Sequence, residues 1–396
     1  MKKIKYILNY IIQGLKETSQ IFISECKNVF RDSGVILIFI IASLGYPLLY
    51  NYVYYNETVR DIPVAIVDES SSSDSRRFIQ KLQATPEVEL IHCANMDEAQ
   101  DLMVKRDVHG VVVIPNDFSN KLANKDQATV SLYTNMSCFI IYKSVALAVN
   151  YVMLDETKSI QIQRYAMNGV VDEKADQLIS AVPYNETILY NPGTGFTSFF
   201  LPALLIIILH QTLFFGIGMI TGTAREEKRL YSQDRSIHGT YRIVFGKASA
   251  YLFIYSILAA YILILIPRIF NLPHIGNVFT LMAFFLPFLL ATIFFSITVS
   301  IFVKNRETGM VMFLFVSILL IFLSGFTWPW QDLPLFWKGL SFIFPSTFGI
   351  QGNIKINTMA ADISQVRFEY IALWVQTFVY FLTSCFTVRY ISREAQ

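Results

Sequence analysis

Six long apolar runs constrain what this chain can fold into. A helix needs about 20 predominantly apolar residues to cross the hydrocarbon layer of a bilayer, and none of the six runs contains Asp, Glu, Lys or Arg. They separate into one isolated run and a later block of five, and they cover residues 34–53, 196–222, 248–267, 278–303, 308–330 and 370–388. We therefore predict a polytopic α-helical membrane protein with six transmembrane helices in a 1+5 arrangement.

The distribution of basic residues predicts how these helices are oriented. The 396-residue chain is 54% hydrophobic and 16% charged, a composition outside the soluble range, and its net charge of +2 gives no bias toward nucleic acid. Lys and Arg gather before the first run and between the second and third. Loops rich in Lys and Arg stay in the cytoplasm. We therefore expect both termini, including the tail 389–396, to be cytoplasmic and residues 54–195 to be extracytoplasmic.

Residues 1–33 are predicted to form an amphipathic helix. Apolar residues recur at helical spacing among lysines and glutamates, at Ile4, Leu8, Ile11, Leu15, Phe22, Cys26 and Val29. Because this segment leads directly into the first run, we expect it to lie along the inner membrane surface. The alternative is a cytoplasmic helix that packs on a partner.

The segment 54–195 alternates between strand and helix patterns. We predict strands at 63–67, 88–93, 111–114 and 129–133, and helices at 72–85, 97–108, 118–122, 140–167 and 171–180. This pattern indicates a small extracytoplasmic α/β domain inserted between the first and second transmembrane helices. Cys93 and Cys138 are the only cysteines in it, and two free thiols are expected rather than a disulfide.

Two segments in the C-terminal block differ from their surroundings. Residues 223–247 include the charged sequence Arg225, Glu226, Glu227 and Lys228, which composition alone assigns to a solvated loop. Residues 327–350 carry helix-breaking prolines and interfacial aromatic residues, so we predict an outer hairpin there.

The chain lacks the common motifs of an enzyme. It has no phosphate-binding P-loop, no His/Cys cluster with metal spacing and no Gly-x-Ser-x-Gly turn. His210 is the only titratable residue deep in an apolar run, apart from cysteines and tyrosines. We expect a neutral imidazole hydrogen-bonded to a neighbouring helix, with a proton relay or substrate contact as the alternative.

These features together resemble the permease subunits of ABC-2 type ABC transporters, in the multidrug-efflux-like branch with a large extracytoplasmic domain. The most specific similarity lies around the fifth run and the outer hairpin, at Ser324, Gly325, Pro329, Pro334 and Pro345. The chain departs from the family pattern at residues 200–203, where Pro-Gly is usual, and after the basic-acidic run, where Gly-Thr is usual.

The resemblance implies a transport subunit that is not itself an enzyme. A separate ABC ATPase would bind ATP, and Arg225, Glu226, Glu227 and Lys228 would belong to a helix that couples the two subunits. The permease would act in the bacterial inner membrane with a second copy or a paralogue, and a periplasmic membrane-fusion adaptor would be a further partner. No cofactor and no nucleic acid are expected. The alternative is a membrane-anchored sensor or assembly factor whose outer domain binds a ligand or protein.

Overall fold

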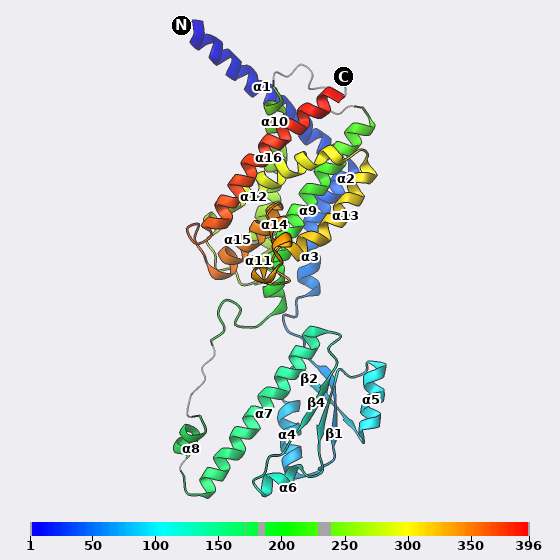
Figure 1. Cartoon of the computed structure of the whole chain (residues 1–396), viewed down its shortest axis with the longest axis vertical. Helices are drawn as coiled ribbons and strands as arrows, with labels where there is room; N and C mark the ends of the chain where they lie inside the picture. Colours follow the sequence, from blue (N-terminus) through cyan, green and yellow to red (C-terminus); the bar gives the residue numbers. More distant parts are fainter. Residues whose placement is uncertain (1, 171, 181–186, 229–238, 395–396) are drawn as a thin grey trace. The chain divides into compact units, whose positions relative to one another are not determined.

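The computed structural model of the chain divides into two compact units (Figure 1). It describes residues 2–170, 172–180, 187–228 and 239–394. Unit 1 comprises Met1–Tyr55 and Ile188–Gln396, and unit 2 comprises Asn56–Thr187. Unit 2 therefore lies within the predicted segment 54–195.

Unit 2 is a four-stranded sheet with helices on both faces. The strands are β1 (Ile62–Asp68), β2 (Val88–Cys93), β3 (Gly110–Ile114) and β4 (Ser131–Thr134). Their order is β2-β1-β3-β4; β1 is parallel to β2 and β3, and β4 is antiparallel to β3. The helices are α4 (Ser73–Gln83), α5 (Met96–Lys105), α6 (Phe118–Ala123), α7 (Phe139–Met167) and α8 (Asp172–Ile179). One core lies under α4 and α7, and a smaller core lies under α5 on the opposite face (Figure 1).

Local sequence signals account for these elements. Ser72 caps α4 in a reciprocal capping box with Ser75. The side chain of Asn95 accepts a hydrogen bond from the backbone of Glu98 at 2.9 Å, which fixes the start of α5 where the sequence predicts it. Cys93 is buried, Cys138 is exposed, and both are free thiols.

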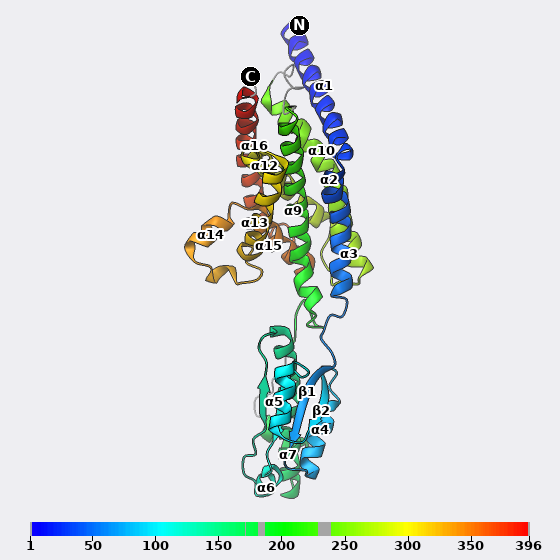
Figure 2. The ribbon, with the colours of Figure 1, turned by 90° about the vertical axis from the view of Figure 1, so that its right-hand side faces the viewer.

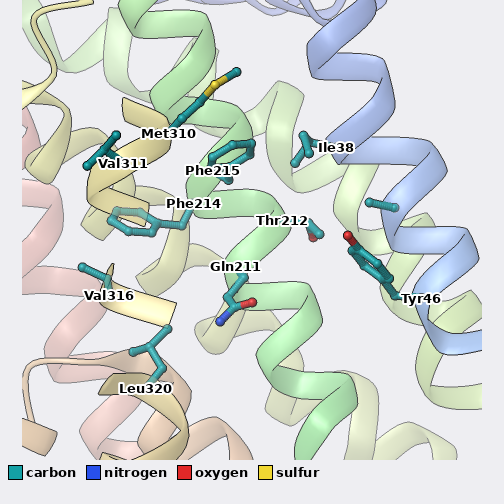
Figure 3. Close-up of a pocket in the computed structure, with 11 residues that line it drawn as sticks. Ile38, Tyr46, Gln211, Thr212, Phe214, Phe215, Met310, Val311, Val316 and Leu320 are labelled. Atoms are coloured by element: carbon teal, nitrogen blue, oxygen red, sulfur yellow. The ribbon is translucent and has the colours of Figure 1, made fainter. Parts of the chain in front are cut away.

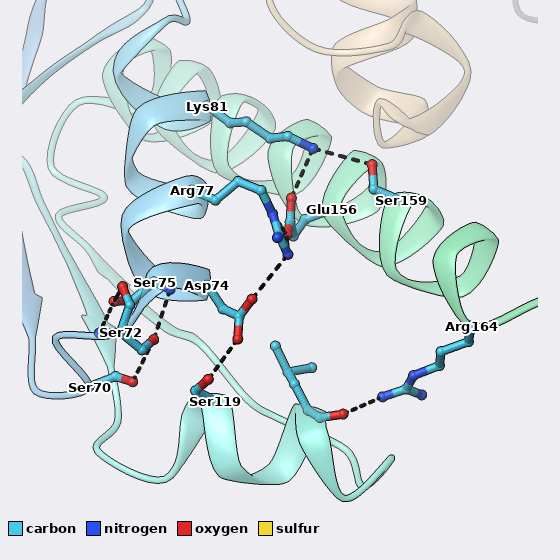
Figure 4. A network of polar contacts seen from close by, with 11 residues as sticks. Ser70, Ser72, Asp74, Ser75, Arg77, Lys81, Ser119, Glu156, Ser159 and Arg164 are labelled. Carbon is cyan, nitrogen blue, oxygen red and sulfur yellow. Dashed lines mark hydrogen bonds and ion pairs between the residues drawn. The ribbon is translucent and has the colours of Figure 1, made fainter. Parts of the chain in front are cut away.

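A polar network joins α4 to α7 in unit 2 (Figure 4). The buried carboxylate of Glu156 pairs with Arg77 at 2.5 Å and with Lys81 at 2.8 Å. Its hydrogen bond raises the pKa of Arg77. Burial opposes the charged form of Lys81, but hydrogen bonds to Asp155 and Glu156 outweigh burial and raise the pKa of Lys81. The network therefore holds the two helices together through charges on their facing sides.

Unit 1 is a bundle of long helices. Its elements are α1 (Lys2–Arg31), α2 (Ser33–Ile36), η1 (Leu37–Ala42), α3 (Ser43–Val53), α9 (Phe196–Glu226), α10 (Thr240–Ala260), η3 (Tyr261–Leu265), α11 (Ile266–Ile269), α12 (Val278–Val299), η4 (Ser300–Phe302), α13 (Arg306–Leu323), η5 (Trp330–Asp332), α14 (Leu335–Ser341), α15 (Pro345–Met359) and α16 (Arg367–Glu394). Five helices among the described residues are long and apolar enough to cross a membrane: Ser33–Val53, Phe196–Glu226, Thr240–Ile269, Val278–Phe302 and Arg367–Ser392. The chain is therefore a polytopic helical membrane protein.

The fifth predicted span, residues 308–330, corresponds to α13, which is shorter than expected. The apolar run continues to residue 330, but α13 ends at Leu323. Gly325 then adopts a left-handed φ of +74°, which glycine tolerates without a steric penalty. Close packing also requires glycine there, because a Cβ would lie 2.8 Å from the Cβ of Trp330. The count of six spans stays a prediction.

Helix α9 lies inside unit 1, between the first span and α13 (Figure 2). Most of its residues from Leu201 to Gly222 are buried. The ring of Phe39 in η1 lies directly against Gly216, where a Cβ would come within 1.7 Å of a ring carbon. The same ring makes edge contacts with Tyr251 and Tyr255 of α10. Phe39 therefore joins the first span to both α9 and α10.

Helix α1 packs on α10 through its acidic face. Glu17 pairs with Arg242 at 2.6 Å, Glu25 pairs with Lys247 at 2.9 Å, and the hydroxyl of Tyr251 donates to Glu25. The third membrane helix begins at Thr240, before the predicted run at 248, and these ion pairs lie in that additional segment.

The opposite side of α1 carries exposed apolar residues. Ile11, Ile12, Leu15, Ile23 and Phe30 are each at least half exposed. These residues would face lipid, whereas Val29 of the predicted stripe is buried in the core of unit 1. The interfacial position of residues 1–33 stays a prediction.

Candidate functional site

The four predicted coupling residues lie at the C-terminal end of α9. Arg225 and Glu226 are its last residues, and the exposed Glu227 caps it. Lys228, also exposed, has a left-handed φ of +53°. The charged sequence therefore begins as an extension of α9, and residues 229–238 of the predicted coupling segment lie outside the described residues.

Arg225 and Glu226 hold the connection between α12 and α13. The guanidinium of Arg225 donates to the carbonyl of Val303 at 2.5 Å and, more weakly, to that of Ile301 at 3.4 Å. The carboxylate of Glu226 accepts a hydrogen bond from the backbone N–H of Arg306 at 3.0 Å. Since Arg306 is the first residue of α13, this carboxylate satisfies a donor that the helix itself leaves free.

The side chain of Arg306 extends the contact to the first span. Its two terminal nitrogens each donate to one oxygen of Asp32 at 3.0 Å, a bidentate pair. Asp32 also caps α2, because its carboxylate accepts from the backbone of Gly34 and Val35. We call Asp32, Arg225, Glu226 and Arg306 the junction. It joins the first span, α9 and α13 at one end of the bundle.

Two glycines allow these helices to approach so closely. A Cβ at Gly34 would lie 1.9 Å from a guanidinium nitrogen of Arg306. A Cβ at Gly222 would lie 2.8 Å from the backbone nitrogen of Arg306. Backbone rather than a flexible side chain stands opposite Gly222, so any larger residue there would separate α9 from α13.

The same three helices line a pocket of about 450 Å³ (Figure 3). The first span contributes Ile38, Ala42 and Tyr46; α9 contributes Gln211, Thr212, Phe214 and Phe215; and α13 contributes Met310, Val311, Val316 and Leu320. Figure 3 shows α9 between the first span and α13, so that its residues form the middle of the pocket. The lining is mostly apolar, with Gln211, Thr212 and Tyr46 as its polar residues.

Two of these polar side chains differ in what they bind. Thr212 is buried, donates to the carbonyl of Ile208 at 2.7 Å and accepts from Ser43 at 3.0 Å. Gln211 is half-buried and makes no hydrogen bond with any described residue. Sequence analysis did not select Gln211; an isolated amide within an apolar run was the available signal.

His210 does not line this pocket and is fully buried. Its ring packs against Phe214 and Phe295, with both centroid distances at 6.0 Å. Neither nitrogen has a hydrogen-bond partner in the described part of the chain. The hydrogen bond to a neighbouring helix that we expected for His210 is therefore not found there.

The motif residues shape the connection between α13 and α15. Ser324 is buried, and its carbonyl accepts from Gln351 of α15 at 3.4 Å. Gly325 provides the turn described above, and Pro329 precedes η5. Pro334 precedes α14, and Pro345 begins α15, where proline needs no hydrogen-bond donor. These residues have structural positions, and they do not join the junction or the pocket.

No group of side chains in the described ranges has the composition of a metal site. No curated protein matches the chain. A family model described as ABC-2 family transporter protein matches residues 33–386, from the first residue of α2 to the last third of α16. The chain therefore belongs to the ABC-2 transporter family and is a membrane component of a transporter.

Proposed function

We propose that the chain is the permease subunit of an ATP-driven exporter whose ATP hydrolysis is performed by a separate ABC ATPase. One observation carries the proposal. The three helices that the junction fastens together, namely the first span, α9 and α13, are the same three that line the pocket. A movement imposed at the junction would therefore change the shape of the pocket.

The end of α9 offers separate surfaces for docking and for transmission. Glu226, Glu227 and Lys228 are all exposed, and Glu227 and Lys228 would contact the ATPase. Arg225 and Glu226 contact the α12–α13 connection and would pass a displacement of α9 into α13. Because α9 is one helix of 31 residues, it would carry that displacement as far as Gln211.

The remaining parts of the proposal follow from the family and from exposed surface. ABC-2 permeases generally work with an ABC ATPase, and two permeases would form the path between them. Tyr46, Met310 and Val311 at the pocket are exposed in the single chain, so a second copy or a paralogue would cover them. We further propose the bacterial inner membrane with both termini in the cytoplasm, and a periplasmic adaptor at unit 2.

The test separates docking from transmission. Reversing the exposed charges, with Glu227→Lys and Lys228→Glu together, should abolish co-purification of the ATPase. Asp32→Asn keeps an oxygen to cap α2 but removes the charge that pairs with Arg306, so it should keep ATPase binding and lose stimulation of hydrolysis by substrate. Asp101→Lys, an exposed charge reversal in unit 2, is the matched control and should change neither.

Two outcomes would contradict the proposal. If Glu226→Lys with Glu227→Lys leaves ATPase binding and export unchanged, the coupling role of this segment is wrong. If purification from native membranes repeatedly yields the chain without a nucleotide-binding subunit, a sensor or assembly factor becomes the better explanation.

A further inference from the structure

We propose that the pocket between the first span, α9 and α13 binds an uncharged amphiphile, and that Gln211 recognises its single hydrogen-bonding group. This inference rests on the proposed function for the idea that the bound molecule is the one exported. The binding itself depends only on the chemistry of the pocket walls.

The walls offer no counterion to a charged ligand. All three wall segments, residues 34–53, 196–222 and 308–323, lack Asp, Glu, Lys and Arg. A ligand with a formal charge would lose its hydration without gaining a counterion, and an unpaired charge in such surroundings is strongly disfavoured. An uncharged molecule incurs no such penalty. The pocket therefore selects by charge before it selects by shape.

Gln211 provides the polar part of the recognition. Its amide carries two donors and one acceptor oxygen, and none of them bonds to a described residue. Thr212 is already satisfied by Ser43 and Ile208, which leaves Gln211 and the hydroxyl of Tyr46 to contact a ligand. In Figure 3 the Gln211 side chain extends from α9 toward the side of the pocket formed by Val316 and Leu320. A carbonyl, amide or hydroxyl group of the ligand fits this position.

The remaining lining fits an apolar body. Ile38, Phe215, Met310, Val316 and Leu320 come from all three helices and present only carbon and sulfur. Met310 is unbranched and adapts to irregular shapes. The volume of about 450 Å³ lies within the range of roughly 300–1,000 Å³ found for small-molecule sites. A drug-sized molecule with one polar group therefore fits better than a polymer.

The chief rival occupant is the acyl chain of a membrane lipid. An acyl chain would satisfy the apolar lining equally well, but it has no group for Gln211. An unpaired amide in an apolar run is unfavourable, and a partner that enters with the ligand removes that penalty. Gln211 therefore favours a ligand with a polar group located within the pocket, and the experiment must separate the two sources.

The experiment uses the full chain in lipid nanodiscs and four photoreactive probes that share one alkyl body with a diazirine. The probes end in a primary amide, a methyl group, a quaternary ammonium or a sulfate. After irradiation, mass spectrometry measures labelling of peptides from α9 and α13. We expect the amide probe to label these peptides most and the two charged probes to label them least. The methyl probe represents a lipid chain.

Two variants change separate properties of the pocket. Gln211→Leu keeps the volume but removes the hydrogen bond, so labelling by the amide probe should fall about five-fold, to the level of the methyl probe. Ala42→Phe fills the pocket from the first span and should reduce labelling by both uncharged probes. Ser256→Leu, at an exposed position on α10, is the matched control and should change nothing. Size-exclusion profiles confirm that each variant is folded.

The outcomes separate this inference from the proposed function. Equal labelling by the amide and methyl probes, with no effect of Gln211→Leu, would show that the pocket holds a lipid chain and would overturn the inference. Preferential labelling by a charged probe would also overturn it. If the expected pattern is found but no ATPase supports export, the proposed function fails while the binding site stands. If export depends on the ATPase while no probe labels the pocket, the binding site is wrong and the proposed function stands.

Discussion

The two units of this protein both bury acidic side chains, but they satisfy them differently. In unit 2, Glu156 is 5% exposed, whereas its partners Arg77 and Lys81 are 41% and 30% exposed. In unit 1, Glu25 is 1% exposed and its partner Lys247 only 16% exposed. The first arrangement therefore gives a buried acid solvent-accessible basic partners, and the second encloses both charges of the pair.

This difference predicts how each unit responds to the loss of one partner. When a charge is removed from an enclosed pair, the other stays buried without compensation. When the buried acid is removed from a pair whose basic partners are exposed, those basic side chains turn into solvent. Equal numbers of ion pairs therefore do not imply equal contributions to stability.

The largest effect is expected for Lys247→Met. Loss of the ammonium leaves the Glu25 carboxylate buried without a counterion among the described residues and with only hydrogen bonds from Tyr251 and Asn28, so the free energy of unfolding of unit 1 should fall by about 3 kcal/mol. Thermal unfolding followed by tryptophan fluorescence in detergent measures the change. Adding Glu25→Gln should restore most of the loss, and Lys304→Met, at an exposed lysine, serves as the control. A double variant no more stable than Lys247→Met would contradict the comparison.

A smaller effect is expected for Glu156→Gln in unit 2. The amide keeps an acceptor for Arg77, while both cations remain reachable by water, so we expect a loss of about 2 kcal/mol at most. Hydrogen exchange of the full chain measures it, because protection of α4 and α7 should fall while that of α9 stays constant. A loss as large as that of Lys247→Met would show that exposure of the partners does not matter.

His210→Leu tests a buried polar side chain that has no described partner, in contrast to the paired acids. Its imidazole is buried without a hydrogen-bond partner among the described residues. An apolar replacement therefore breaks no described hydrogen bond and removes the unfavourable burial of two polar nitrogens. We expect the unfolding free energy to stay within about 1 kcal/mol of the original protein or to rise. A large loss of stability would show that His210 has a bonding partner, and a selective loss of transport would favour the relay alternative.

The smallest expected effect is a difference in labelling rate between the two cysteines of unit 2. Burial, together with the nearby charge of Glu98, raises the pKa of the Cys93 thiol above its usual value. Because the thiolate is the reactive form, Cys93 should react with a membrane-impermeant maleimide more slowly than the exposed Cys138, and its rate should increase with pH. Intact cells test the predicted side as well, since Cys138 should be labelled without lysis. Faster labelling of Cys93 would contradict the buried position.

The sequence predicted most elements because their signals are local. The strands of unit 2 lie within one or two residues of their predicted positions, since alternation and turn residues act over a few positions. The apolar runs likewise match five helices long enough to span a membrane. The end of α13 was predicted too late, because hydropathy continues through Gly325 while the backbone turns there.

The functional contacts were less predictable because they join distant parts of the chain. Arg306 and Asp32 are 274 positions apart, and neither residue carries a motif. The coupling role of the charged sequence 225–228 stays a prediction, and which of its residues contact the α12–α13 connection depends on where α9 ends. Gln211 became notable only when three helices were seen to meet around it.

The hydrogen bond from Thr197 to the carbonyl of Tyr54 connects the end of the first span to the start of α9. Tyr54 follows the last turn of α3, and Thr197 lies in the first turn of α9. The bond therefore joins the chain segment that leads to unit 2 with the segment that returns from it. The two chain segments that connect to unit 2 therefore leave unit 1 at one point. A displacement of α9 would therefore move both of these departure points together.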